Sequence, residues 1–163
     1  MVRLGVDWAI GIEFCGGDTK FTVLNIYTPF ESSANESEYL NRLAYVMACI
    51  QDNLSSRIFI VGDWNADLSD HRSTFASHLK HFCSDNGLFL SSELLLPNDS
   101  YTYTSEAWHT TSWLDHCICT SDAHNSIEDI RINYELTSFD HVPFSLCIRI
   151  GNTPSFMPAS KLN

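Results

Sequence analysis

The chain has 163 residues, of which 44% are hydrophobic and 18% charged, with 7 Gly and 5 Pro. This length and balance are typical of one packed globular domain, and they exclude a disordered or collagen-like chain. The 20 Asp and Glu against 9 Lys and Arg give a net charge of −11, which argues against a broad basic face for non-specific nucleic-acid binding and favours a bound cation.

No part of the sequence has the pattern of a targeting or membrane segment. No run approaches the ~18 apolar residues of a membrane span. Residues 1–14 contain Asp7 and Glu13, where a signal peptide needs an unbroken apolar core. We therefore expect that the protein is not secreted, does not contact a membrane and has an intracellular location, nuclear or cytoplasmic. The six cysteines form no Cys-x-x-Cys pair, and we expect reduced thiols.

The first predicted elements are two strands and a helix. Residues 10–15 and 20–27 are β-rich runs separated by Gly-Gly-Asp, which is typical of a hairpin. A polar stretch over 31–37 then precedes an apolar stripe with alternating spacings of three and four, which predicts a helix with one face in the core. The stripe consists of Leu40, Leu43, Met47, Ile50 and Leu54.

The remaining elements alternate between strands and one further helix. Residues 58–61 are all apolar and predict a strand buried on both faces, and a helix over about 70–86 is predicted with Ser69 or Asp70 as its cap and Gly87 at its end. Three strands are predicted over 112–120, 127–134 and 144–150, with a polar loop over 121–125. Residues 1–150 therefore read as one domain, and residues 151–163 as a frayed tail.

Three short clusters place carboxylates or amides at the ends of apolar strands. An unpaired carboxylate is costly to bury there, so a shared cation or a histidine is its natural partner. Three carboxylates and one amide supply the oxygen ligands that Mg²⁺ prefers, and this ion keeps waters for substrate phosphates. The clusters therefore suggest metal-assisted phosphoester hydrolysis. The clusters are Gly62-Asp63-Trp64-Asn65, Ser112-Trp113-Leu114-Asp115-His116 and Phe139-Asp140-His141.

Each cluster alone also has a plainer interpretation. Gly-Asp-x-Asn could be a tight turn whose side chains bond their own backbone, and Asp140-His141 could be a cap. Asp115 is harder to explain in this way, because Asp contributes little to packing inside a strand and is depleted there. The order and joint occurrence of the clusters favour a shared site.

In this order the motifs resemble the endonuclease/exonuclease/phosphatase superfamily, with Tyr27-Thr28-Pro29 before the clusters and Thr102-Tyr103-Thr104 among them. Its members include deoxyribonuclease-I-like enzymes, abasic-site endonucleases and the endonuclease domains of non-LTR retrotransposons, and the motifs are closest in style to the last. The resemblance implies an α+β fold in which two sheets pack face to face with helices outside.

The resemblance also implies a role for each matching residue. His141 would act at the scissile phosphate as base or transition-state stabiliser, and Asp115 would orient it. Asp63 would position the attacking water or protonate the leaving oxygen. Three further roles are implied: phosphate contact for Asn65, hydrogen-bond donation beside the phosphate for Tyr27, and a share in holding Mg²⁺ or Mn²⁺ for Asp140.

The sequence departs from the family pattern in two places. Phe139 stands where the family commonly has a small Ser. The family draws a metal-binding Glu and an Asn from an N-terminal half, and nothing before Tyr27 matches them; Glu13 is the only glutamate there, in an outward strand position. The resemblance therefore implies that the N-terminal part of the fold is missing and that an apolar sheet face needs a cover.

The sequence thus predicts a metal-dependent phosphodiester hydrolase of the endonuclease type, with DNA as its substrate. Two alternatives stay open. The missing Glu favours a catalytically silent remnant that serves as a binding or structural module. A phosphatase of small phosphoesters is the other, because the same site serves either substrate and specificity lies in loops.

Overall fold

The computed structural model describes residues 6–16, 19–52, 55–136 and 139–150. In this part of the chain the helices are α1 (Glu36–Asp52), α2 (Thr74–Asp85), α3 (Ser91–Leu95) and α4 (Ser121–His124). The strands are β1 (Ala9–Gly16), β2 (Thr19–Tyr27), β3 (Ile58–Asp63), β4 (Phe89–Leu90), β5 (Tyr103–Ser105), β6 (Thr110–Ser112), β7 (Asp115–Cys119), β8 (Ile127–Ile132) and β9 (Phe144–Ile148).

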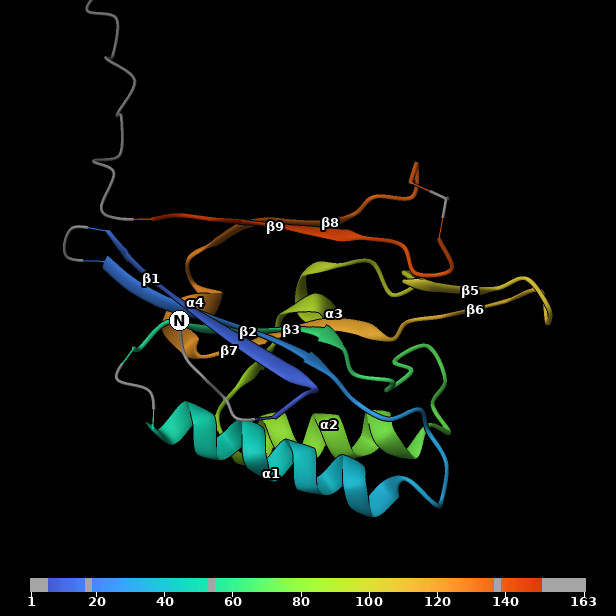
Figure 1. Cartoon of the computed structure of the whole chain (residues 1–163). Coiled ribbons are helices and arrows are strands. Elements are labelled where there is room, and N and C mark those ends of the chain that lie inside the picture. The colour runs from blue at the N-terminus through green and yellow to red at the C-terminus, as the bar shows by residue number, and fades with distance from the viewer. Residues whose placement is uncertain (1–5, 17–18, 53–54, 137–138, 151–163) are drawn as a thin grey trace, which may run out of the picture.

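A five-stranded mixed sheet in the order β1-β2-β3-β7-β4 forms the centre of the molecule. β1 and β2 are the predicted antiparallel hairpin, β2 and β3 run parallel, and β7 is antiparallel to both β3 and β4. α1 and α2 cover one face of this sheet, and the separate pair β8-β9 lies over the other face (Figure 1). The prediction of an α+β fold with two packed sheets and outer helices is confirmed.

The core on the helical face differs in one respect from the predicted stripe. Tyr39, Leu43 and Val46 are the buried residues of α1, whereas Leu40 is 42% exposed. The ring of Tyr39 stacks on Phe75 of α2 at 4.0 Å between centroids, and this large contact turns the helix so that Leu40 lies at the edge. The predicted stripe also included Leu54, which lies outside the described residues.

The second helix begins later than the sequence predicted. Its N-cap is Ser73, whose Oγ accepts a hydrogen bond from the Ala76 N–H, and neither Ser69 nor Asp70 caps it. Asp70 instead accepts from the Arg72 N–H, an Asx turn that competes with helix formation. Gly87 follows the helix with a φ of 62°, in agreement with its predicted role at the end.

The strand predicted over 112–120 is divided into β6 and β7. Trp113 and Leu114 lie between them, and their carbonyl oxygens accept hydrogen bonds from Leu68 and Trp64 in the segment that follows β3. The polar loop predicted over 121–125 is the short helix α4. The predicted tail, 151–163, lies outside the described residues.

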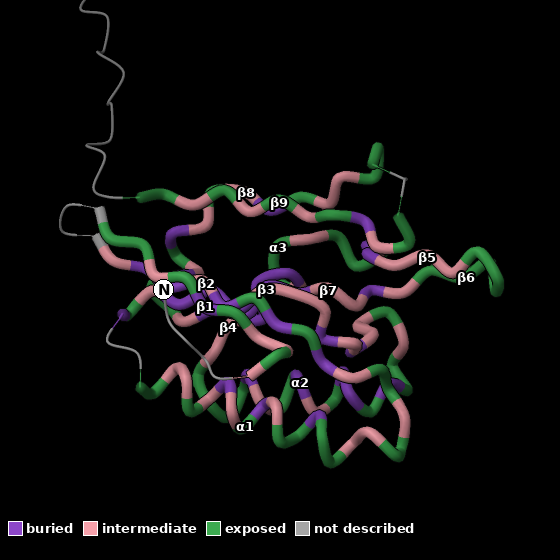
Figure 2. The backbone as a smooth tube through the Cα atoms, in the orientation of Figure 1, coloured by how far each residue is buried: buried purple, intermediate pink, exposed green. Residues whose placement is uncertain are grey.

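The second core lies between β8-β9 and the central sheet. Buried residues are concentrated in the central strands, which lie between the helices and this pair (Figure 2). The pair leaves β1 uncovered: Ile10, Ile12 and Phe14, at alternate positions and hence on one face, are 52%, 43% and 44% exposed. Phe14 stacks on Phe21, a member of the second core, so the exposed residues continue that core outward.

The six cysteines are free, in agreement with the prediction of reduced thiols. No helix in the described part of the chain has the length and apolar character needed to cross a membrane.

Candidate active site

Strand register brings three of the predicted site residues to one edge of the central sheet. Asp63 ends β3 and lies beside Tyr27 of parallel β2 and opposite Asp115 of antiparallel β7. Gly62 permits the close approach of β2, because a Cβ at this position would lie 2.0 Å from the carbonyl oxygen of Ile26 and the φ is 133°. The glycine of the Gly-Asp-x-Asn cluster therefore serves the position of Asp63.

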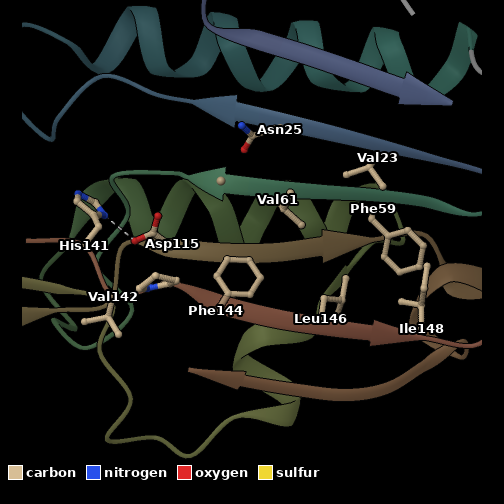
Figure 3. A pocket seen from close by; sticks show the side chains of 12 residues that line it. Val23, Asn25, Phe59, Val61, Asp115, His141, Val142, Phe144, Leu146 and Ile148 are labelled. Carbon is tan, nitrogen blue, oxygen red and sulfur yellow. Dashed lines mark hydrogen bonds and ion pairs between the residues drawn. The ribbon is translucent and has the colours of Figure 1, made fainter. Parts of the chain in front are cut away.

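Asp115 and His141 form a hydrogen-bonded pair at this edge. His141 Nδ1 lies 2.8 Å from Asp115 Oδ2, and Figure 3 shows the two side chains pointing toward each other. Because a carboxylate only accepts, Nδ1 carries the proton and Nε2 is left to face Asp63, whose Oδ2 is 3.9 Å away. The bond to Asp115 and the charges of Asp115, Asp63 and Asp140 outweigh partial burial and raise the pKa of His141.

The Thr102-Tyr103-Thr104 motif fixes both members of this pair. Thr102 is fully buried, and its Oγ1 accepts hydrogen bonds from the Leu114 and Asp115 amides at 3.0 and 2.9 Å. Its carbonyl accepts from the Val142 amide at 2.7 Å. Tyr103 forms a β-bridge with His141. No role for Thr102 was predicted from the sequence, and the only signal was its place in a short motif beside the clusters.

Asn65 and Asp63 form a second pair. The Asn65 main-chain amide donates to Asp63 Oδ1 at 2.9 Å, and its side-chain amide donates to the Thr28 carbonyl at 2.8 Å and to Asp63 Oδ2 at 3.2 Å. Burial, aided by the charge of Asp115, raises the pKa of Asp63 to about 6, although the bonds from Asn65 and the charge of His141 oppose the shift.

Asp140 and Tyr27 are more open than the residues above. Asp140 is exposed, and its Oδ1 accepts from the His141 amide at 3.1 Å. Tyr27 is 56% exposed. Phe139, which replaces the small residue of the family pattern, is 73% exposed. Its ring thus projects from the loop and does not crowd the site.

The carboxylates of the described residues do not complete a metal centre. Among these residues no group of three or more His, Cys, Asp and Glu side chains has the geometry to hold a metal ion. Glu13 forms an ion pair with Lys20 at 2.7 Å and pairs in register with Thr22, so it lies about 16 Å from Tyr27 along the strand at ~3.3 Å per residue. The ligands present fit at most one side of a magnesium site.

The site opens into an apolar groove of about 520 Å³ between the central sheet and β9. Asp115 and His141 lie at one end of it, Asn25 of β2 adds one more polar side chain, and the remaining side chains of the lining are apolar (Figure 3). The apolar side chains of the lining that Figure 3 labels on the strands are Val23, Phe59, Val61, Phe144, Leu146 and Ile148.

No protein-family model matches the sequence, and no curated protein matches it. Solved structures do match. The endonuclease domain of TRAS1, a telomere-specific non-LTR retrotransposon, is similar with a TM-score of 0.72 and 18% identity over 90% of this chain and 64% of that chain. The 3′ phosphatase NExo from Neisseria, bound to a product DNA hairpin, has a TM-score of 0.66 and 17% identity over 79% and 61%. The catalytic domain of Xenopus laevis APE2 has 0.66 and 17% over 87% and 55%.

These matches define the class of fold, a two-sheet α+β sandwich shared with nucleases and a phosphatase. The chain has the fold of the endonuclease/exonuclease/phosphatase superfamily, to which a matching structure from Leptotrichia buccalis is also assigned, and the resemblance seen in the motifs is confirmed at this level. The chain spans less than two thirds of the length of each of these structures.

Proposed function

We propose that this chain is part of a metal-dependent phosphodiester hydrolase of the endonuclease type. The observation that carries the proposal is the row of Asp115, His141 and Asp63, in which an imidazole fixed by one carboxylate presents Nε2 to a second one. Such a row can hold and move a proton beside a phosphate, as in other sites where a carboxylate orients a catalytic histidine.

In this proposal His141 Nε2 acts at the scissile phosphate, as a base or as a donor to the charge that develops there. Asp115 holds the ring in the tautomer with a proton on Nδ1 and stabilises the imidazolium form. Asp63, with a pKa raised to about 6 by burial, can give a proton to the leaving oxygen or orient the attacking water near neutral pH. The Tyr27 hydroxyl would bind a phosphate oxygen. The Asn65 side-chain amide would bind another by giving up one of its two present bonds, the longer one to Asp63 Oδ2.

A divalent ion, Mg²⁺ or Mn²⁺, would neutralise charge on the phosphate in such a reaction. Asp140 is the ligand that we assign to this chain. Its carboxylate is exposed, and its acceptor oxygens are not used up by the single bond from the His141 amide. The other protein ligands would have to come from outside the described residues, as the family's metal-binding Glu does.

Polypeptide outside the described residues would also cover the apolar face. The groove beside β9 and the exposed Ile10, Ile12 and Phe14 form one apolar surface on the second-core side of the sheet. The similar structures are longer than the part that this chain matches, which supports the proposal that a further sheet segment packs there.

DNA is the substrate that we favour, and two alternatives rest on specific observations. One similar structure is a 3′ phosphatase bound to a DNA product. This match supports DNA as the substrate, and it also supports hydrolysis of a phosphomonoester as the alternative reaction. The incomplete ligand set supports a catalytically silent remnant that binds without cutting.

Nicking of supercoiled plasmid distinguishes these functions. The 163-residue chain, alone and joined to the N-terminal strands of a related endonuclease domain, is assayed with Mg²⁺, with Mn²⁺ and with EDTA. We expect nicking with either metal in the joined form, abolished in His141→Ala and unchanged in His81→Ala, which alters an exposed histidine of α2. Release of phosphate from a 3′-phosphorylated oligonucleotide without nicking would favour the phosphatase. Inactivity of every form would favour the catalytically silent remnant.

A further inference from the structure

His116 follows Asp115 on β7, but its side chain lies on the opposite face of the strand and has no part in the proposed chemistry. The residue is fully buried, and Nε2 lies 2.7 Å from the Ala66 carbonyl oxygen. Because a carbonyl only accepts, Nε2 carries the proton. Burial lowers the pKa of His116 to about 4 against the charges of Asp115, Asp67 and Glu93, so the ring is neutral at pH 7.

The same residue makes a second contact with the segment after β3. Its main-chain carbonyl accepts a hydrogen bond from the Trp64 indole nitrogen at 3.3 Å. Trp64 and Ala66 are the residues on either side of Asn65. His116 therefore fixes the chain immediately before and immediately after Asn65.

Asn65 needs to be held because its backbone is left-handed, with a φ of 46°. This region is unfavourable for residues with a Cβ, although Asn tolerates it better than most. In this conformation the Asn65 main-chain amide donates to Asp63 and its side chain donates to Thr28. A displacement of Ala66 would move both donors.

Two main-chain hydrogen bonds also join these segments, from Trp64 to Leu114 at 3.0 Å and from Leu68 to Trp113 at 3.1 Å. They tie down the two ends of the stretch from 64 to 68. The buried imidazole reaches its middle, at Ala66. Its contribution is thus distinct from that of the main-chain bonds.

We propose that His116 is a positioning residue, which holds Asn65 in its left-handed conformation and so maintains the hydrogen bond from Asn65 to Asp63. Its imidazole acts through Ala66 and contacts no substrate, whereas the bond from Trp64 goes to the main-chain carbonyl and is kept in every variant. The effect on hydrolysis rests on the proposed function above, whereas the effect on the bond between Asn65 and Asp63 does not.

The test compares two replacements in the 163-residue chain. His116→Phe keeps a ring of similar size but removes the N–H donor, and His116→Gln restores an amide donor near the place of Nε2. The side-chain carboxyl carbon of Asp63 is followed against pH by NMR. The bond from Asn65 lowers the Asp63 pKa, so its loss in His116→Phe should raise that pKa by roughly half to one unit. His116→Gln should return it close to the wild-type value.

His124→Phe is the matched control for a general loss of packing. His124 is partly buried, and its Nδ1 bonds Ser91 Oγ at 2.9 Å. It lies in α4, beyond the end of β7 opposite to Asp115. The control should lower the melting temperature and leave the Asp63 titration unchanged. An equal shift in His124→Phe, or no shift in a folded His116→Phe, would overturn the proposal. If His116→Phe does not fold, His116→Asn, whose shorter amide does not reach Ala66, takes its place in both comparisons.

Hydrolysis gives a separate readout. In whichever form cuts a phosphodiester, His116→Phe should lower kcat by about ten- to a hundredfold with KM nearly unchanged, since a small displacement of a catalytic group costs rate more than binding. His116→Gln should recover most of the rate. If neither the 163-residue chain nor the joined form cuts, a shifted Asp63 pKa would still uphold the positioning role, and the proposed function would be refuted.

Discussion

His141 and Asp115, which are 26 residues apart in the sequence, are joined by a hydrogen bond of 2.8 Å between Nδ1 and Oδ2. The bond turns Nε2 toward Asp63, so one imidazole lies between two carboxylates of different strands. The first carboxylate fixes the ring, and both raise the pKa of His141. The neutral form that can accept a proton at Nε2 therefore becomes dominant at a higher pH than in a free histidine.

Replacement of Asp115 by Asn should lower hydrolysis by about a hundredfold or more, because the amide keeps the shape but does not stabilise imidazolium. The pKa of His141, followed by NMR, should fall in the same variant. A raised histidine pKa stabilises the fold below the unfolded value near 6.5, and this contribution is lost as pH rises through the higher folded value. The stability difference from wild type should therefore be present at pH 5 and small at pH 9.

Asp129→Asn is the control, since Asp129 is a partly exposed carboxylate paired with Arg131 on β8. It should change neither the rate nor the titration of His141. Full activity in Asp115→Asn would remove Asp115 from the mechanism.

Asp63→Asn should stabilise the protein at alkaline pH while it abolishes activity. Asp63 has a pKa raised to about 6, from 3.8, chiefly by burial. Such a group stabilises the fold below pH 3.8, and this contribution is lost as pH rises through 6. A neutral amide avoids the loss but gives up the acceptor for the Asn65 side chain, so we expect a net gain of about 1–2 kcal/mol at pH 8 and none at pH 4. Urea unfolding at both pH values measures it, and equal effects at both would contradict the raised pKa.

Thr102→Val should cost about 2–4 kcal/mol of unfolding free energy. The change removes the oxygen that accepts from the Leu114 and Asp115 amides, and each buried amide left without a partner costs about 1–3 kcal/mol. Thr102→Ser keeps that oxygen and should cost about 1 kcal/mol or less, for the lost methyl group. If both variants unfold at the same denaturant concentration, the hydroxyl does not hold Asp115.

Local patterns predicted the parts of this fold that local physics decides. The hairpin and the buried strand over 58–61 follow from alternation, apolar runs and turn residues, and both are present. The α+β class followed from the resemblance of the motifs instead. The buried face of α1 did not follow, because Leu40 and Tyr39 offer two overlapping stripes, and the stacking partner of Tyr39 lies 36 residues away in α2. A residue's own neighbours in sequence carry no information about such a contact.

The candidate site was also predictable only in part. Asp63, Asp115 and His141 are recognisable because charged residues beside apolar strands need partners, and the structure brings them together. Thr102 and His116 gave no comparable signal. A buried threonine is common in strands, and the carbonyl that the His116 ring contacts lies 50 residues earlier in the chain. Their roles emerge only from the crossing of two distant segments.

The exposed face of β1 should make the 163-residue chain bind hydrophobic dyes and associate. Ile10 and Ile12 are about half exposed, so their replacement by Thr removes apolar surface from water at little cost to the core. We expect the double variant Ile10→Thr, Ile12→Thr to bind less of the dye ANS and to sediment closer to a monomer, with an unchanged near-ultraviolet circular dichroism spectrum. Leu94→Thr, an exposed change on α3, is the control. Equal dye binding in the double variant and wild type would mean that this face is not the apolar surface in solution.

Magnesium binding by the 163-residue chain should be weak, with a dissociation constant in the millimolar range or above. Asp140 is the one ligand that we assign to it, and a site with too few carboxylates loses both affinity and geometry. Joining the chain to the N-terminal strands of a related endonuclease should add the missing ligand and cover Ile10, Ile12 and Phe14. We expect tighter binding by calorimetry and a sharper thermal transition, with both gains kept in His141→Ala and only the first lost in Asp140→Asn. Tight binding and robust nicking by the 163-residue chain, abolished by His141→Ala, would show that the chain completes its own site with a ligand not assigned above.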